Sequence, residues 1–271
     1  MAKREEELKL KNKEETIHKI AILSLKGGVG KTTIALNLGA ALSRLGKRVL
    51  LVDLDPNNDL TLNLGLEPTQ IKGVEYFITA DIPFEGVVVN CQDNLDILPA
   101  GKRLKEQEIS LYGLYKKEPE YSYNLLKQAF EQSDIHYDFI IVDCAPNAGI
   151  LNHNSLVFAE NILIPIQCHN LAVHGSQRTV FFVHKIKVHY NSNLRIIGVV
   201  PSMFDRRNKL SEKVLAELKA AYNNLVTETI IRVNIALAEA PAFGKPIFDY
   251  RANSRGAEDF TQLATELLQK L

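Results

Sequence analysis

The sequence predicts an α/β fold in which a doubly wound, mostly parallel sheet carries helices on both faces. The first observation behind this prediction is a series of continuous apolar runs of strand length, which recur between Ile20 and Val200. The second is that segments with helical periodicity separate these runs. Parallel strands are buried on both faces and joined through helices, so they show continuous rather than alternating hydrophobicity.

The first expected strand, 20–25, is apolar apart from Ser24. The helix expected at 34–45 has apolar residues at 34, 35, 38, 41, 42 and 45, which share one face. Gly46 ends this helix, and the apolar strand 47–53 follows directly. These elements form the first strand–helix–strand unit.

The later elements repeat the alternation. The short strand 95–99 ends at Pro99, and a helix at 123–133 leads to 139–143, the most apolar strand of all. The remaining expected strands are 161–165 and 195–200, and the remaining expected helices are 172–190, 210–223 and 256–270. We expect one domain over 19–271. A charged extension over 1–18 precedes it, contains few apolar residues and is expected to be flexible.

Composition excludes several classes of protein. The chain has 271 residues, and 32 Lys and Arg residues balance 32 Asp and Glu residues, so nucleic-acid binding requires a local basic patch. The scattered Cys91, Cys144 and Cys168 predict a reducing compartment, here the cytoplasm, and argue against zinc or a metal cluster within one chain. No segment approaches the roughly 20 apolar residues that span a bilayer.

A glycine-rich loop, Lys26–Thr33, joins the first expected strand to the first expected helix. This arrangement lets backbone N–H groups surround phosphates at a helix N-terminus, where the partial positive charge favours an anion. The expected nucleotide-binding residues are Gly27, Gly28, Val29, Gly30, Lys31, Thr32 and Thr33. Lys31 is expected on the β- and γ-phosphates, and the Thr32 hydroxyl on Mg²⁺.

Aspartates follow two other expected strands at the edge where ligands bind in such sheets. Asp143 ends an apolar strand, which is the Walker-B pattern of a carboxylate that holds Mg²⁺. Asp53 and Asp55 are two residues apart and share one face of an extended chain. We expect Asp55 to orient the attacking water, and Asp53 to lie near the metal or to anchor the turn. The predicted metal ligands are therefore Thr32, Asp53 and Asp143.

A second lysine, Lys26, stands at the front of the loop. Together with segments 46–56, 137–144 and 164–168, this loop resembles the deviant Walker-A motif of ParA/MinD-type ATPases, which have a P-loop NTPase fold. The resemblance covers about 19–271, and the segments 239–246 and 254–258 resemble ParA partition ATPases in particular.

The resemblance implies ATP, ADP and Mg²⁺ as cofactors and a homodimer that forms with ATP. It implies that Lys26 reaches the phosphates of the second protomer and that Asp55 activates water, so the expected catalytic residues are Lys26, Lys31 and Asp55. It also places Pro241 and Phe243 in a loop beside the adenine.

ParA relatives bind DNA without sequence preference and position a plasmid, a chromosome or a protein organelle on the nucleoid. A cargo-bound, ParB-like protein stimulates their hydrolysis. The resemblance implies DNA contacts here from Arg206, Arg207, Lys209 and Arg232. Val233 and Ala236 stand where many relatives have arginine, so the DNA surface departs from the family pattern.

Two alternative functions are compatible with the same predicted fold. A MinD-like ATPase that cycles on membranes requires a basic amphipathic C-terminal helix, but Glu258, Asp259 and Glu266 outnumber Lys270 here, and core packing explains the apolar stripe better. A metabolic or iron–sulfur relative of the same fold is the other alternative, and the cysteine positions do not favour a cluster.

Overall fold

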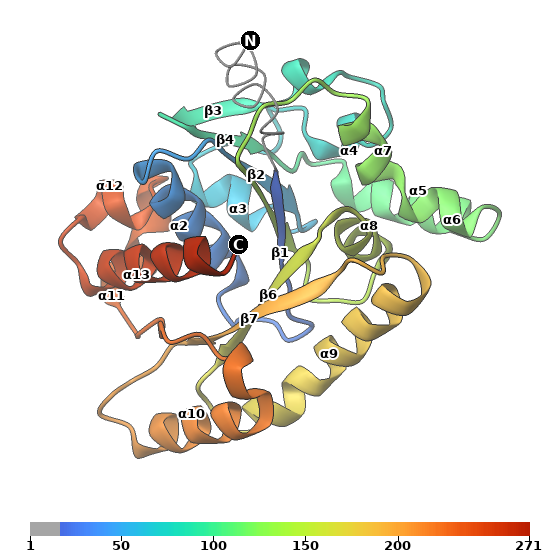
Figure 1. Ribbon diagram of the computed structural model, residues 1–271. Helices are drawn as coiled ribbons and strands as arrows, with labels where there is room; N and C mark the ends of the chain where they lie inside the picture. Colours follow the sequence, from blue (N-terminus) through green and yellow to red (C-terminus); the bar gives the residue numbers. More distant parts are fainter. Residues whose placement is uncertain (1–16) are drawn as a thin grey trace, which may run out of the picture.

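The strands form one sheet that is parallel except at one edge (Figure 1). The computed structural model describes residues 17–271, and within them the sheet has seven strands in the order β3-β4-β2-β5-β1-β6-β7. The strands are β1 (His18–Ile22), β2 (Val49–Leu54), β3 (Val89–Gln92), β4 (Leu95–Leu98), β5 (Phe139–Cys144), β6 (Asn161–Gln167) and β7 (Arg195–Ser202). This confirms the predicted doubly wound α/β fold.

The edge strand β3 was not predicted. It pairs antiparallel with β4 through a bulge between Asn90 and Gln92, and its side chains are mostly half-buried. Such a strand lacks the continuous apolar run on which the prediction depended. At the start of the chain, β1 begins at His18, one residue before the expected domain boundary, and the rest of the predicted extension, 1–16, lies outside the described residues.

Helices cover both faces of the sheet. One face carries α2 (Lys31–Arg44), α3 (Asp59–Asn63), α11 (Ile235–Glu239), α12 (Ile247–Arg251) and α13 (Arg255–Lys270). The other carries α4 (Val74–Phe77), α5 (Leu104–Tyr115), α6 (Pro119–Tyr123), α7 (Leu125–Glu131), α8 (Ile150–Phe158), α9 (Ala172–His189) and α10 (Lys209–Tyr222). Short 3₁₀ turns are η1 (Phe84–Gly86), η2 (Asn223–Leu225) and η3 (Ala240–Phe243).

Local sequence explains where the predicted helices were right and wrong. Side-chain caps mark the start of three C-terminal helices, since Asn208, Asn234 and Ser254 each accept a backbone N–H of the first turn. The single helix expected at 123–133 is two helices, α6 and α7, that meet at Asn124. The helix α5 was missed because it buries only Leu104 and Leu111 and so shows little periodicity.

The C-terminal helix α13 is part of the core. Phe260, Leu263 and Leu267 are fully buried and belong to the apolar cluster that includes α2. Burial of each such side chain contributes about 1.5–3 kcal/mol. The apolar stripe of α13 therefore packs in the core, as expected for a helix with more acidic than basic residues. Within residues 17–271, no helix combines the length and hydrophobicity that crossing a membrane requires.

The strand register brings the chemical segments together. In the sheet β1 and β2 flank β5, and Asp143 is paired with Ile22 on one side and with Asp53 on the other. The glycine loop that follows β1 and the acidic ends of β2 and β5 therefore lie side by side at the carboxyl edge of the sheet.

Candidate nucleotide site

The glycine loop has a backbone that only glycine adopts without strain. Gly28 has φ +71° and Gly30, the N-cap of α2, has φ +90°. The loop is tied to the next elements by side chains, because the Ser202 hydroxyl donates to the Val29 carbonyl at 2.8 Å and Thr179 accepts the Leu25 N–H at 3.1 Å. The loop is therefore held open at the N-terminus of a 14-residue helix, where an anion is favoured.

The two lysines of the loop lie in different environments. Lys31 is the first residue of α2 and is 7% exposed, and its charge acts on both Asp55 and Asp143. Lys26 is exposed, and its stem lies beside Gly175 of α9. In the part of the chain that the structure describes, no carboxylate forms an ion pair with Lys26.

Asp143 has the features of a metal-binding carboxylate. It is fully buried, and neither of its oxygens has a hydrogen-bond partner among residues 17–271. Burial first and the Asp53 charge second raise the pKa of Asp143 well above its usual value, while the Thr32 side chain and Lys31 lower it. An unpartnered buried carboxylate is costly unless a cation binds it.

These residues fit Mg²⁺ that is shared with a nucleotide. Thr32 and Asp143 provide oxygen ligands, which Mg²⁺ prefers. Among the described residues, no cluster of three or more His, Cys, Asp and Glu side chains is arranged to hold a metal ion. Mg²⁺ commonly binds through one or two protein oxygens together with substrate phosphates, so this sparse donor set is the expected one.

Asp53 is held by hydrogen bonds in the turn that follows β2, and its predicted role as a metal ligand stays a prediction. Its carboxylate accepts the Asp55 N–H at 3.2 Å, the Thr61 N–H at 2.9 Å and the Thr61 hydroxyl at 2.6 Å. Burial raises the pKa of Asp53 to about 7, and these hydrogen bonds oppose that rise. Asp53 is therefore the anchor of the turn that follows β2, which is the second of the two roles considered.

Asp55 lies in this turn with its carboxylate near Lys31. One oxygen accepts the Asn57 N–H at 3.0 Å. Burial raises the pKa of Asp55, and the Asn57 N–H and the Lys31 charge lower it. A carboxylate that is buried beside the phosphate-binding lysine is suited to orient a water molecule, so the predicted role of Asp55 is chemically consistent.

A cavity of about 450 Å³ continues from the loop along one side of α2. Six residues that line it are Gly30, Thr33, Ile34, Met203, Asn234 and Leu237. Met203 has φ +51°, a strained conformation for a side chain of this type. Pro241 and Phe243 are absent from the lining of this cavity; Phe243 is 61% exposed and stacks on Tyr250 at 5.0 Å. Their adenine-side role stays a prediction.

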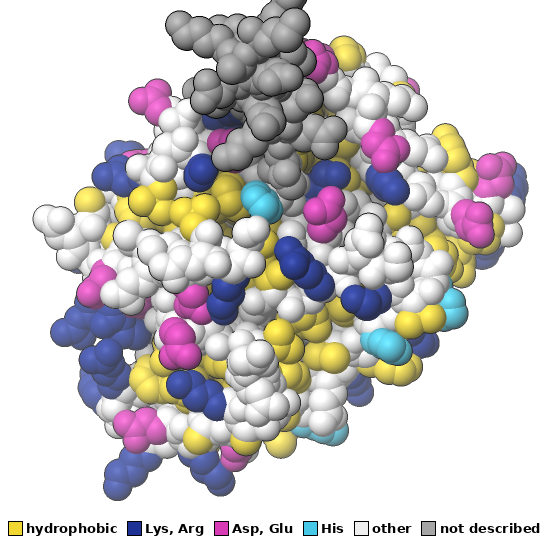
Figure 2. All heavy atoms as spheres, viewed as in Figure 1, with side chains coloured by type: hydrophobic (Ala, Val, Ile, Leu, Met, Phe, Trp, Pro, Cys, Tyr) yellow, Lys and Arg dark blue, Asp and Glu magenta, His cyan; other side chains and the backbone are white. Residues whose placement is uncertain are grey.

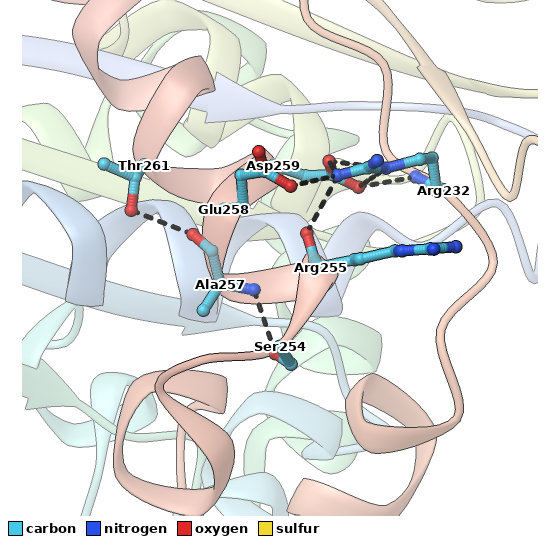
Figure 3. Close-up of polar contacts among 7 residues, drawn as sticks. All are labelled: Arg232, Ser254, Arg255, Ala257, Glu258, Asp259 and Thr261. Atoms are coloured by element: carbon cyan, nitrogen blue, oxygen red, sulfur yellow. Dashed lines mark hydrogen bonds and ion pairs between the residues drawn. The ribbon is translucent and has the colours of Figure 1, made fainter.

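The structure pairs Arg232, a predicted DNA contact, with two carboxylates, and its contact with DNA stays a prediction. Its guanidinium forms an ion pair with the buried Asp259 of α13 and a second with Glu258 at 2.7 Å (Figure 3). The Arg232 backbone N–H also donates to Asp259, at 2.9 Å. With 17% of its side chain exposed, Arg232 serves to join the segment before α11 to α13.

The other predicted DNA residues are exposed at the bend between β7 and α10. Arg206, Arg207 and Lys209 are all exposed, and Arg207 makes a solvent-exposed ion pair with Asp205 at 3.0 Å. On the face drawn in Figure 2, Lys and Arg side chains gather at the left edge between α11 and α10. These three side chains are therefore accessible to an anionic partner, and their contact with DNA stays a prediction.

Several residues that hold the site together were not found from sequence. Thr61 binds Asp53, and its hydroxyl also accepts the Ala100 N–H at 2.9 Å. Asn37 on α2 accepts the Ile247 N–H at 2.7 Å, across 210 residues of chain. Isolated Thr and Asn residues have no spacing signal, since their partners become neighbours only in the folded sheet.

Comparison with known proteins agrees with this geometry. The family model of an AAA domain matches residues 17–196. The sporulation initiation inhibitor protein Soj of Bacillus subtilis is 40% identical over 250 residues, which are 92% of this chain and 97% of the relative. The chromosome-partitioning ATPase Soj of Thermus thermophilus is 36% identical and covers 94% of this chain and 97% of its own length.

A solved structure supports the same class. Cobyrinic acid a,c-diamide synthase from Mycobacterium smegmatis, with bound ATP analogue and magnesium, has a TM-score of 0.79 and 29% identity, and the match covers 94% of this chain and 95% of the synthase chain. The fold and the glycine loop thus define a P-loop nucleoside triphosphatase. Within that class, the chain belongs to the ParA/MinD family of ATPases.

Proposed function

We propose that this ATPase dimerises with ATP, binds nucleoid DNA without sequence preference, and positions or segregates a cargo together with a partner protein that stimulates hydrolysis. ATP, ADP and Mg²⁺ are its cofactors, and it works in the cytoplasm. The observation that carries the proposal is the exposed Lys26 at the front of the loop, in a chain whose relatives named for chromosome partitioning are 34–36% identical over most of their length.

In this proposal each residue at the carboxyl edge has one task. Lys31 and the loop N–H groups hold the phosphates, and Thr32 and Asp143 hold Mg²⁺, which neutralises phosphate charge when bound. Asp55 orients the water that attacks the γ-phosphate. Lys26 supplies a cation to the second protomer, so that hydrolysis depends on the dimer. The cavity beside Met203 and Asn234 receives the base.

The absence of an ion pair at Lys26 among the described residues supports its proposed role in the dimer. A loop lysine with a structural task within its own protomer is expected to form an ion pair or to be buried, and Lys26 does neither within residues 17–271. In the proposed dimer, Lys26 faces the nucleotide site of the second protomer.

For DNA, the proposal relies on Arg206, Arg207 and Lys209. Exposed cations in one bend can neutralise backbone phosphates, although the chain as a whole carries no net charge. The partner is expected to be ParB-like. We expect the cargo to be a plasmid, a chromosome or a protein organelle, as the resemblance to ParA ATPases implies.

DNA retention across a salt series tests the proposal. The parent should bind DNA with ATP and lose it with ADP or without nucleotide, and Arg207→Ala should weaken ATP-dependent retention and reduce its salt dependence by about one phosphate contact. Lys127→Ala is the matched control, because Lys127 is exposed on α7 and, among residues 17–271, forms an ion pair with Glu131 alone. Retention that is indifferent to nucleotide would reduce the proposal to a plain ATPase.

Light scattering after size exclusion tests the dimer. The parent and Asp55→Ala should be dimeric with Mg²⁺ and a non-hydrolysable ATP analogue, and Lys26→Ala should remain monomeric. Asp55→Ala should also stop turnover. A parent that stays monomeric at saturating analogue would contradict the proposal.

The alternatives have less support. The apolar face of α13 is buried against the core, so it is not free to enter a membrane surface. A cluster shared between two protomers needs accessible thiols, whereas Cys144 and Cys168 are buried. The synthase that matches in structure is 29% identical, below the 34–40% of the partition relatives.

A further inference from the structure

One buried amide holds the turn that follows Asp143. Asn152 lies on α8 and is fully buried. Its Oδ1 accepts the Ala145 N–H at 3.1 Å, and its Nδ2 donates to the Ala145 carbonyl at 2.7 Å and to the Asn147 carbonyl. Three polar backbone groups of the turn 145–147 are therefore satisfied by one side chain.

The same turn is held from its other end. The Asn147 side chain accepts the Gly149 N–H at 2.8 Å. A Cβ at Gly149 would lie 2.7 Å from a carboxylate oxygen of Glu108 and 3.0 Å from the Tyr112 hydroxyl, so α5 approaches the turn closely. The turn is thus enclosed between α5 and α8, at the edge where Asp55 and Asp143 lie.

Loss of this amide would leave buried backbone groups without partners. An unsatisfied buried group is costly, so the turn would move until water or another donor reached it. Ala145 is two residues from Asp143, and a shift of its backbone displaces that carboxylate. A misplacement of about 1 Å near the reacting groups lowers a rate by about 100-fold.

We propose that Asn152 is a positioning residue for ATP hydrolysis, which acts by fixing the turn 145–147 and thereby the carboxylate of Asp143. Asn152 has no place in the lining of the cavity and contacts the site through the backbone alone. The inference rests on the ATPase activity, and its hydrogen-exchange measurement, made without nucleotide, does not depend on the proposed dimer, DNA binding or partner.

The chain offers a matched control on the same helix. Asn154 is 3% exposed, and its amide also makes three hydrogen bonds. It accepts the Leu126 N–H and donates to the carbonyls of Ser122 and Ile150, so it does not touch the turn 145–147. Replacing either asparagine removes three hydrogen bonds, but only Asn152 supports the turn.

The experiment compares the parent with Asn152→Ala, Asn154→Ala and the milder Asn152→Thr. Three quantities are measured: thermal unfolding, hydrogen exchange of a peptide over 144–149 without nucleotide, and kcat and KM for ATP with Mg²⁺. Both alanine variants should unfold at similar, lower temperatures. Only Asn152→Ala should exchange faster over 144–149 and lose about 10- to 100-fold in kcat, with KM changed less than about threefold.

Asn152→Thr keeps a hydroxyl that can donate to one carbonyl, so it should show an intermediate loss of kcat and intermediate exchange. Unchanged exchange over 144–149 in Asn152→Ala would overturn the proposal, as would equal losses of kcat in the two alanine variants. If Asn152→Ala does not fold, Asn152→Thr decides, and a parental kcat or parental exchange in that variant overturns it.

Discussion

The ion pair of Arg232 with Asp259 provides a direct test of the role that the structure gives to Arg232. Asp259 is 3% exposed at its side chain and accepts hydrogen bonds from the Arg232 backbone N–H and from the guanidinium (Figure 3). Arg232→Ala removes the cation but leaves the carboxylate buried. An uncompensated buried charge usually costs 3–5 kcal/mol, and we expect about 2–4 kcal/mol because 17% of the Arg232 side chain remains exposed.

A loss of this size is readily measured. For a domain of this length, 1 kcal/mol corresponds to about 2–4 °C in Tm, so Arg232→Ala should unfold roughly 4–16 °C below the parent. Asp259→Leu should be similarly unstable, because it leaves Arg232 without its main partner. The double variant Arg232→Ala with Asp259→Leu should recover part of the loss, with a coupling energy of about 1–3 kcal/mol in a double-mutant cycle from urea unfolding.

The exposed pair Lys127 and Glu131 is the control for this cycle. Its side chains are 47% and 61% exposed, and removing it should change stability by less than about 0.5 kcal/mol. If Arg232→Ala costs less than about 1 kcal/mol and instead weakens ATP-dependent DNA retention, then Arg232 is a DNA contact and the structural reasoning is wrong.

Three further predictions follow from the buried groups. Asp143→Asn removes a buried carboxylate that lacks a hydrogen-bond partner, so calorimetry without nucleotide should show a Tm equal to or above that of the parent. Mg²⁺-dependent turnover should fall at least about 100-fold. A Tm below that of the parent would contradict the prediction. Burial favours a higher pKa for Glu266, but hydrogen bonds from Lys270 and Thr229 outweigh it and lower the pKa. The stabilisation from Glu266 is present above the pKa of the unfolded chain and is lost as pH falls through the lower folded pKa. Glu266→Gln should therefore be about 1 kcal/mol less stable than the parent at pH 7 in urea unfolding, and this difference should shrink as the solution is made more acidic. Gly39→Ala should lower the free energy of unfolding by about 1–3 kcal/mol, because the added methyl group would lie 2.6 Å from a Leu51 methyl. An unchanged midpoint of urea unfolding would contradict this prediction and show that the core accommodates the methyl group.

An element of the fold was predictable where its sequence pattern lies within the segment itself. The expected strand over 139–143 and the helix over 256–270 are present as β5 and α13, because long apolar runs and regular periodicity are properties of the segment itself. The edge strand β3 and the helix α5 were missed because they bury few side chains and are stabilised by the elements beside them.

The candidate site divides in the same way. The sequence by itself determined the glycine loop, its two lysines and the carboxylate near the end of β5, since each needs only a residue type near a strand end or helix start. Only the tertiary structure decided that Asp53 anchors a turn, that Arg232 pairs with a residue 27 positions away, and that Asn152 holds the turn after Asp143. A polar side chain acquires its role from the partner that folding brings within about 3 Å, and that partner leaves no spacing pattern in the chain.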